Sequence, residues 1–192
     1  MRLPVSKDYP KTKVRTLADT TSSTCLDLAD LRAELAAFLD GQGCTVRISE
    51  DPDRFSVDPT GDAMKTCLRN VETCDFVVCI LDRRYGGVTN AGPYPELSAT
   101  HAEFRHAKGR DPQIPTCVFL RQRARDDYEL LANDPETPTR WVEPEDPDRR
   151  KQWFGFAKEL MKSKWVDQFK TSVDLKKLVL KRLADYRQGL IP

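Results

Sequence analysis

Apolar positions along the chain follow two patterns that alternate. In the first, apolar residues return every three or four positions, as on one face of a helix, and Leu28, Leu31 and Leu35 are an example. In the second, short apolar runs stand between polar segments, and Phe76–Leu81 is the most apolar of them. A strand that is apolar on both faces is typical of the centre of a parallel sheet. The patterns predict strands at 14–21, 44–48, 76–81, 116–120 and 165–169, and helices at 26–39, 62–71, 96–108, 150–162 and 173–186.

The predicted strands and helices alternate, which indicates an α/β fold. Such an order gives three layers, with a parallel sheet between two layers of helices. Five strands favour a flavodoxin-like sheet with the order 2-1-3-4-5. In sheets of this kind ligands bind beyond the carboxyl ends of the strands, at the switch point between the first and third strands. Polar residues that follow these two strands are therefore the first candidates for a site.

The length of the chain fits a single domain. The chain has 192 residues, and domains of roughly 100–200 residues are common. We expect one domain over residues 1–192, with its core at about 14–186. Residues 121–150 are rich in charge and proline, and we predict that they form a charged surface excursion.

Charge and hydropathy exclude several classes of protein. Lys and Arg number 31 and Asp and Glu number 30, so the net charge of +1 argues against general nucleic-acid binding. The longest apolar run has six residues, far below the ~18 that a membrane span needs. The first residues carry no apolar leader segment. We therefore expect a cytoplasmic protein that does not contact a membrane.

The six cysteines do not have the spacing of a zinc site. Several of them lie in apolar runs, where a free Cys behaves as a small buried hydrophobe. His101 and His106 are five residues apart and do not share a helix face well, so we interpret both as surface residues or satisfied polar residues. These patterns predict reduced structural thiols, no metal and no resident cofactor.

Three hydroxyl residues follow the first predicted strand. Ser22, Ser23 and Thr24 stand directly ahead of the helix predicted at 26–39. Hydroxyls and backbone N–H groups at the start of a helix can hold a phosphate or a ribose hydroxyl. The same residues also suit plain helix capping, and their spacing favours neither interpretation.

The loop after the third predicted strand carries Arg83, Arg84, Tyr85 and Gly86. The fork of donors on an arginine suits phosphate, and a tyrosine ring can stack on a base or a nicotinamide ring. A glycine lets the backbone approach a ligand closely. Because the segment follows the most apolar strand, we favour a ligand-binding loop over a charged surface turn.

The helix predicted at 96–108 places Ser98 or Thr100 near Glu103 on one face. A carboxylate that faces a ribose can act as a nucleophile or stabilise an oxocarbenium ion, and either role suits cleavage of an N-glycosidic bond. Most glutamates in helices are simply solvated. Glu103 is therefore a candidate catalytic residue only in combination with the other two segments. The chain has no Gly-Lys-Ser or Gly-Lys-Thr, no Gly-x-Gly-x-x-Gly and no Gly-x-Ser-x-Gly, which argues against an NTPase, a Rossmann dehydrogenase and an α/β-hydrolase.

Three blocks of sequence, in order along the chain, resemble one known family. They are Ser22-Ser23-Thr24 with Asp27-Leu28 and Leu31-Arg32-x-Glu34; Cys67 to Val71 with Cys74-Asp75-Phe76-Val77-Val78 and Arg84-Tyr85-Gly86; and Ser98-x-Thr100-x-x-Glu103-Phe104-x-x-Ala107. The family is DUF4062, a group of TIR-like domains, and the resemblance covers about residues 14–186. The chain departs from the family at His101, where a Glu is common, and in residues 17–21, which are more polar than usual.

The resemblance implies a fold related to TIR domains and to nucleoside 2-deoxyribosyltransferases. Members of those wider groups break N-glycosidic bonds of NAD or nucleosides with a helix-borne glutamate. Glu103 matches the position of that glutamate in the transferase-type pattern. Ser22, Ser23, Arg84 and Tyr85 would then line the ligand pocket.

The leading hypothesis is a TIR-like enzyme that cleaves the N-glycosidic bond of NAD or a related nucleotide, which is its substrate and not a cofactor. Glu103 would attack or stabilise the anomeric carbon, Arg84 would hold phosphate and Tyr85 would stack on the base. A role in antiviral defence follows from the resemblance alone. One alternative is a non-catalytic signalling module that binds nucleotide or forms a homo-oligomer. A further alternative is a nucleoside deoxyribosyltransferase, which base exchange would reveal.

Overall fold

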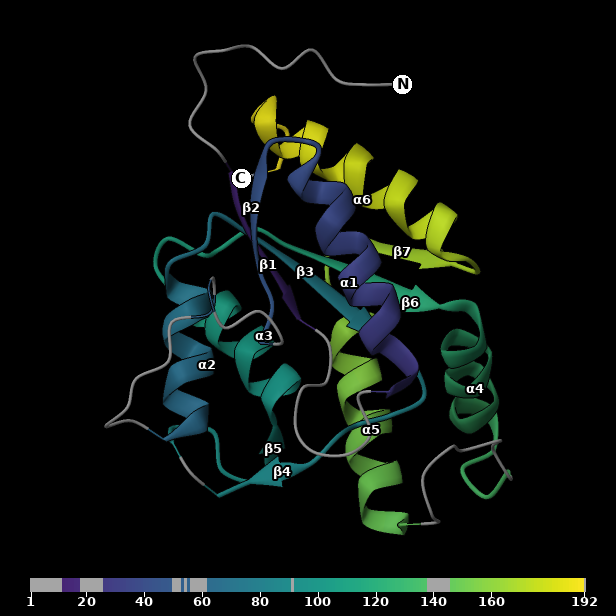
Figure 1. Cartoon of the computed structure of the whole chain (residues 1–192). Coiled ribbons are helices and arrows are strands. Elements are labelled where there is room, and N and C mark those ends of the chain that lie inside the picture. The colour runs from purple at the N-terminus through teal and green to yellow at the C-terminus, as the bar shows by residue number, and fades with distance from the viewer. Residues whose placement is uncertain are drawn as a thin grey trace.

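A five-stranded sheet forms the centre of the protein (Figure 1). The computed structural model describes residues 12–17, 26–49, 53, 55, 62–90, 92–137 and 146–191. The sheet strands are β1 (Thr12–Leu17), β2 (Cys44–Arg47), β3 (Phe76–Leu81), β6 (Thr116–Arg121) and β7 (Val166–Phe169). They pair in the order β2-β1-β3-β6-β7, and every pair is parallel. The predicted flavodoxin-like α/β class is confirmed.

A separate two-stranded ribbon lies in the chain between β3 and β6. Its strands, β4 (Val88–Thr89) and β5 (Leu97–Ser98), pair antiparallel. The sequence predicted a loop at 83–95 and a helix from 96, because strands of two residues leave no periodicity to detect. The ribbon changes the predicted numbering 2-1-3-4-5, since the last two strands of the sheet are the sixth and seventh of the chain.

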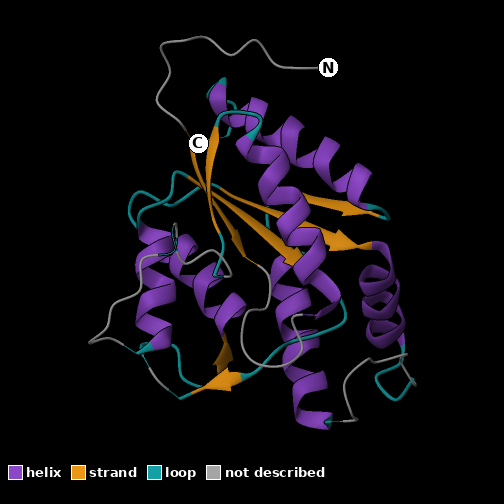
Figure 2. Cartoon of the chain, in the orientation of Figure 1, coloured by secondary structure: helices purple, strands orange, loops and turns teal. Residues whose placement is uncertain are grey.

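Helices cover both faces of the sheet (Figure 2). One face packs against α1 (Leu26–Asp40) and α6 (Ser172–Arg187). The other packs against α2 (Ala63–Glu72), α3 (Ala99–Gly109), α4 (Gln122–Asn133) and α5 (Pro147–Leu160). No helix in the described ranges is long and apolar enough to span a membrane.

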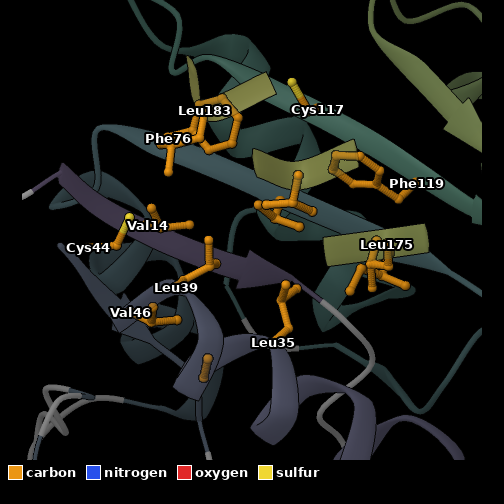
Figure 3. Packing of buried hydrophobic residues seen from close by; sticks show 14 of the residues in the cluster. Val14, Leu35, Leu39, Cys44, Val46, Phe76, Cys117, Phe119, Leu175 and Leu183 are labelled. Atoms are coloured by element: carbon orange, nitrogen blue, oxygen red, sulfur yellow. The ribbon is translucent and has the colours of Figure 1, made fainter. Parts of the chain in front are cut away.

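The strand β3 serves both faces because its side chains alternate in direction. Phe76, Val78 and Ile80 join the apolar cluster under α1 and α6. Figure 3 shows Phe76 beside Leu183 of α6. All six residues of β3 are buried, as the continuous apolar run predicted.

The opposite face of β3 holds the second apolar cluster. Val77, Cys79 and Leu81 point into it, together with Phe104 of α3 and Trp153 of α5. Both clusters therefore share the central strands, and the sheet lies inside one continuous core. This second face also carries the polar residues described below.

The segment 121–150, predicted as a charged surface excursion, contains a helix that packs against the core. Arg121 closes β6, and residues 122–133 form α4, which packs with Ala124, Asp127 and Leu131 buried. Its apolar stripe is short and one of its buried residues is an aspartate, so the pattern indicated an exposed segment. Residues 138–145 lie outside the described part of the chain, and α5 then begins at Pro147 with Asp146 as its N-cap.

Other predicted elements agree closely with the structure. α1, α2, β2, β7 and α6 have the predicted type, and no end of these elements differs from its predicted position by more than one residue. The first predicted strand, 14–21, corresponds to β1, and residues 18–21 lie outside the described residues.

Candidate functional site

Glu103 lies beside the carboxyl ends of β1 and β3. It sits in the second turn of α3, whose first residue is Ala99. Burial first, and then the charge of Glu103, raise the pKa of the Cys79 thiol well above its usual range. Cys79 pairs in register with Leu17, the last residue of β1. The carboxylate of Glu103 therefore faces the sheet at the switch point between the first and third strands.

Glu103 shares this interior position with Thr100. The exposed fraction of Glu103 is 0% and that of Thr100 is 3%. The two residues are three apart on α3, so their side chains are neighbours on one helix face. Thr100 Oγ1 has no hydrogen-bond partner in the part of the chain that the structure describes. A buried polar group without a partner destabilises the folded state by roughly 1–3 kcal/mol. If this position served packing alone, an apolar residue would therefore be more stable here.

A chain of hydrogen bonds runs along the other side of α3. The Tyr85 hydroxyl lies 2.8 Å from His101 Nδ1, and His101 Nε2 lies 3.0 Å from Glu159 Oε2 of α5. Arg105 Nη2 donates to the same carboxylate oxygen at 2.7 Å. The His101 ring also stacks on Phe156, with the ring centroids 4.2 Å apart. These contacts link the loop after β3 to α3 and α5.

The protonation states in this chain follow from burial. Burial lowers the pKa of His101 below its usual 6.5, although the hydrogen bond to Glu159 acts in the opposite direction. Burial raises the pKa of Tyr85, and hydrogen bonds with Ser98 offset only part of the rise. At neutral pH His101 is therefore uncharged. Its Nε2–H donates a hydrogen bond to Glu159, and its Nδ1 accepts a hydrogen bond from the Tyr85 hydroxyl.

A second charged cluster occupies the carboxyl ends of β3 and β6. Asp82, the residue after β3, has a carboxylate that is 1% exposed. Arg121 Nη1 donates to its Oδ2 at 2.9 Å, and Arg123 donates to both of its oxygens, at 2.7 Å to Oδ1. The carbonyl oxygen of Asp82 accepts from Trp153 Nε1 of α5 at 2.8 Å.

A sequence model of the family described as "Domain of unknown function (DUF4062)" matches residues 21–184. The chain belongs to the DUF4062 family. A comparison with curated proteins found no match. The matched region contains β3, α3 and α5, and so includes all the residues of the site described above. Because the family's function is unknown, a function for this DUF4062 domain has to be argued from its own residues.

The structure places Tyr85 of the DUF4062 domain in its core. The exposed fraction of Tyr85 is 2%, and its ring packs edge-on against His101 and Phe156. Neither face of the ring is therefore open to a base, in contrast to the predicted stacking role. Tyr85 instead positions His101 through its hydroxyl group. Gly86 is also buried and has φ 87°, a left-handed conformation that favours glycine.

Arg83 and Arg84 differ in their surroundings. Arg83 makes a bidentate ion pair with Asp127 of α4, at 2.6 and 3.1 Å, and both side chains are largely buried. Its guanidinium group therefore holds α4 against the sheet. Arg84 is half-buried in the same loop.

Ser98 begins α3 as its N-cap. Its side chain accepts from the backbone N–H of His101 at 3.4 Å, and it lies beside the Tyr85 hydroxyl. The predicted residues Thr100 and Glu103 are thus close together, while Ser98 faces the Tyr85 side of the helix. Ser22, Ser23 and Thr24 lie outside the described residues.

Sequence reasoning missed the cluster around Asp82. Its signal is present in the sequence, because Asp82 follows β3 and Arg121 ends β6, and these two strands are adjacent in a sheet of the predicted order. Treating 121–150 as a surface excursion removed Arg121 and Arg123 from consideration. Likewise, the contact of Glu159 with His101 joins residues 58 apart, which no local pattern predicts.

The cysteines in the described part of the chain are buried, like apolar residues. Burial raises the pKa of Cys117 to about 12, so it stays a thiol at neutral pH. Among the described residues no group of three or more His, Cys, Asp or Glu side chains could hold a metal ion. The buried cysteines that form no disulfide in the described structure are Cys44, Cys67, Cys74, Cys79 and Cys117.

Proposed function

We propose that this DUF4062 domain cleaves the N-glycosidic bond of NAD or a related nucleotide, with Glu103 as the catalytic carboxylate. The observation that carries the proposal is the placement of Glu103 and Thr100, two interior polar residues at the ligand-binding edge of the sheet. Buried polar groups at such an edge are characteristic of functional sites. The resemblance to TIR-like and deoxyribosyltransferase-like domains supports the same chemistry.

The reaction follows from a carboxylate held next to a ribose. The bond between the anomeric carbon and the base nitrogen breaks, and the base leaves with the bonding electron pair. Glu103 stabilises the positive charge that develops on the ribose, or forms a bond to the anomeric carbon. Water then adds to the anomeric carbon and gives up a proton. The Thr100 hydroxyl, one turn away, is suited to bind a ribose hydroxyl.

The burial of Glu103 sets a condition on this chemistry. With an exposed fraction of 0%, its carboxylate reaches a sugar only when the packing around α3 opens. The same observation favours a second candidate function, a non-catalytic nucleotide-binding or self-associating signalling module in which Glu103 is structural. Deoxyribosyl transfer remains a third candidate, because it needs the same glutamate.

The proposal also includes a location in the cell and a biological role. The buried thiols of the described residues suit a reducing compartment, and we place the protein in the cytoplasm. The TIR-like resemblance suggests a role in bacterial defence signalling through loss of NAD.

The test is a screen for released base. The purified chain is incubated with NAD, NADP and a set of nucleosides and nucleotides, and nicotinamide or free base is measured by chromatography. We expect release by the wild type, no release by Glu103→Gln, and wild-type release by Glu136→Gln, which removes an exposed carboxylate. Base exchange between nucleosides in place of hydrolysis would identify a transferase. Equal release by wild type and Glu103→Gln would reject Glu103 as the catalytic residue.

A further inference from the structure

The helix α3, which carries Glu103, is packed between α2 and α5 (Figure 1). Toward α2 its contact is apolar and is made by Ala99 and Ala102. Toward α5 it presents Phe104 to the second apolar cluster, and His101 and Arg105 to polar groups. The face with Glu103 meets the sheet between these two contacts. A sugar therefore reaches Glu103 only when one of the two contacts opens.

The polar contact with α5 depends on a single carboxylate. His101 Nε2 lies 3.0 Å from Glu159 Oε2, and Arg105 Nη2 donates to the same oxygen at 2.7 Å. Arg105 Nε also donates to both oxygens of Glu159, at 3.2 and 3.1 Å. We call His101, Arg105 and Glu159 the Glu159 contact. Because both residues of α3 bind one side chain, the loss of that side chain releases both of them.

The Glu159 contact is partly open to solvent. The side chain of Glu159 is 31% exposed and that of Arg105 is 46% exposed, while that of His101 is 6% exposed. The ion pair can therefore break and form again without a change in the core. The apolar contact with α2 is buried, and it has no such accessible part. The contact with α5 is thus the one that can open while α3 stays attached to α2.

A similar set of side chains on the α2 side of α3 provides an internal comparison. The Tyr94 hydroxyl lies 3.4 Å from His106 Nδ1, and His106 Nε2 lies 2.9 Å from Glu72 Oε1 of α2. Arg110 Nη1 lies 3.2 Å from the same oxygen. The two sets use the same four residue types, but the one at Glu72 lies beside an apolar contact that holds α3 without it.

We propose that the Glu159 contact is autoinhibitory: it keeps α3 closed over Glu103, and its release lets a nucleotide reach the carboxylate. Release frees the side of α3 that faces α5, and the turn with Glu103 then moves away from the sheet. The inference rests on the proposed function, because it concerns access to the catalytic carboxylate. It assigns the burial of Glu103 to a closed state of the domain.

Two buried cysteines of the full chain report the opening separately from activity. Cys79 belongs to the second apolar cluster, beside Glu103, and Cys117 belongs to the cluster on the other face of the sheet. Both are 0% exposed, so each reacts with a thiol reagent only when its surroundings open. The probe is N-ethylmaleimide, and mass spectrometry of peptides gives the labelling rate of each cysteine.

We expect Glu159→Ala to raise the labelling rate of Cys79 about tenfold or more and to leave that of Cys117 unchanged. The reason is that charge-assisted hydrogen bonds which hold the closed state are lost. Glu72→Ala is the matched control, since it removes the equivalent carboxylate on the α2 side, and both of its rates should match the wild type. In a chain that releases base, Glu159→Ala should also raise that release about threefold or more.

Three labelling results would overturn the inference: an unchanged Cys79 rate in Glu159→Ala, an equal rise for Cys79 and Cys117, or the same rise of Cys79 in Glu72→Ala. Circular dichroism shows whether each variant folds, and Arg105→Gln decides the matter if Glu159→Ala does not fold. Selective labelling of Cys79 without faster base release, in a chain that does release base, would also overturn it.

The same experiments separate this inference from the proposed function. Selective labelling of Cys79 in a chain that releases no base, as wild type or as Glu159→Ala, would reject the proposed function and retain the contact that closes α3. Base release by the wild type without selective labelling in the variant would reject the autoinhibitory contact and retain the proposed function.

Discussion

Glu103 and Glu159 are two glutamates of the same core with different surroundings. Burial alone would raise the pKa of Glu159, but hydrogen bonds donated by Arg105 and His101 outweigh it and hold the pKa below 4.5. Glu103 is more deeply buried, on the face of α3 that meets the sheet. Glu159 thus anchors α3 to α5, and we assign the chemistry to Glu103.

The lowered pKa of His101 predicts that acid weakens the fold. Below pH 6.5, His101 binds a proton in the unfolded chain. In the folded chain its pKa is lower, so the same proton binds only at lower pH. The free energy of unfolding should therefore fall with pH in this window. A further loss follows as the pH drops below 4.5, because the folded-state pKa of Glu159 is also lowered.

Urea unfolding of the wild type and of His101→Gln over this pH range measures the effect. The variant should lose less stability than the wild type just below pH 6.5. Identical pH profiles for the two proteins would show that His101 does not titrate differently on folding.

Thr100→Val separates a functional hydroxyl from a structural one. Removing a buried hydroxyl that has no partner in the described structure should leave the stability unchanged or raise it by about 1 kcal/mol. The same variant should lower the rate of base release if the hydroxyl binds the ribose. Thr116→Val is the control, because Thr116 Oγ1 donates to the Ile114 carbonyl at 2.9 Å and its loss should cost about 1 kcal/mol. A destabilised Thr100→Val would reveal a structural role.

At the scale of elements, α4 depends on an ion pair. Its Asp127 accepts two hydrogen bonds from Arg83, which comes from the loop after β3. Because both side chains are largely buried, loss of one partner leaves the other charge in the interior. The helix is therefore attached by this ion pair as well as by the apolar contacts of Ala124 and Leu131.

We expect Asp127→Ala to lower the free energy of unfolding by about 3 kcal/mol. Asp126→Ala, one position earlier on the exposed side of α4, should change it by less than about 0.5 kcal/mol. Urea unfolding followed by circular dichroism measures both. Equal changes in the free energy of unfolding for the two substitutions would mean that the buried ion pair does not stabilise the fold.

The element scale also shows what sequence alone could predict. β3 was predicted at its observed bounds because a continuous apolar run has one good interpretation, a central strand. α4 and the β4–β5 ribbon were missed because burial there depends on an ion pair and on strands of two residues. Both depend on contacts between distant parts of the chain.

The candidate site was predictable in the same partial way. The edge at which Glu103 lies follows from the order of strands, so the position of the glutamate could be predicted. The direction of Tyr85 could not, because its place against His101 and Phe156 arises only when α3 and α5 pack. The pairing of Asp82 with Arg123 likewise needed the true start of α4.

At the scale of the whole molecule, the two apolar clusters share β3 and β6. Trp153 lies in the cluster under α3 and α5, and Trp165 packs against the cluster under α1 and α6. Because the same strands supply side chains to both clusters, neither face can lose its packing without disturbing the other. We expect the domain to unfold in a single cooperative step.

Fluorescence can follow each face separately. Two variants, one keeping Trp153 and one keeping Trp165 with the other tryptophans replaced by Phe, are unfolded in urea. For each variant, the midpoint of unfolding is measured both by fluorescence and by circular dichroism. Within each variant the two midpoints should coincide. A fluorescence midpoint that departs from the dichroism midpoint in either variant would show that one face unfolds on its own.

The central claim concerns Glu103, and the rate of base release tests it most directly. The measurement is the turnover of the best substrate from the screen by wild type, Glu103→Gln and Glu136→Gln, each shown to be folded by circular dichroism. We predict that Glu103→Gln lowers the rate about a hundredfold or more, since it removes the charge that stabilises the transition state. Glu136→Gln should match the wild type. Turnover by Glu103→Gln at the wild-type rate would contradict the account.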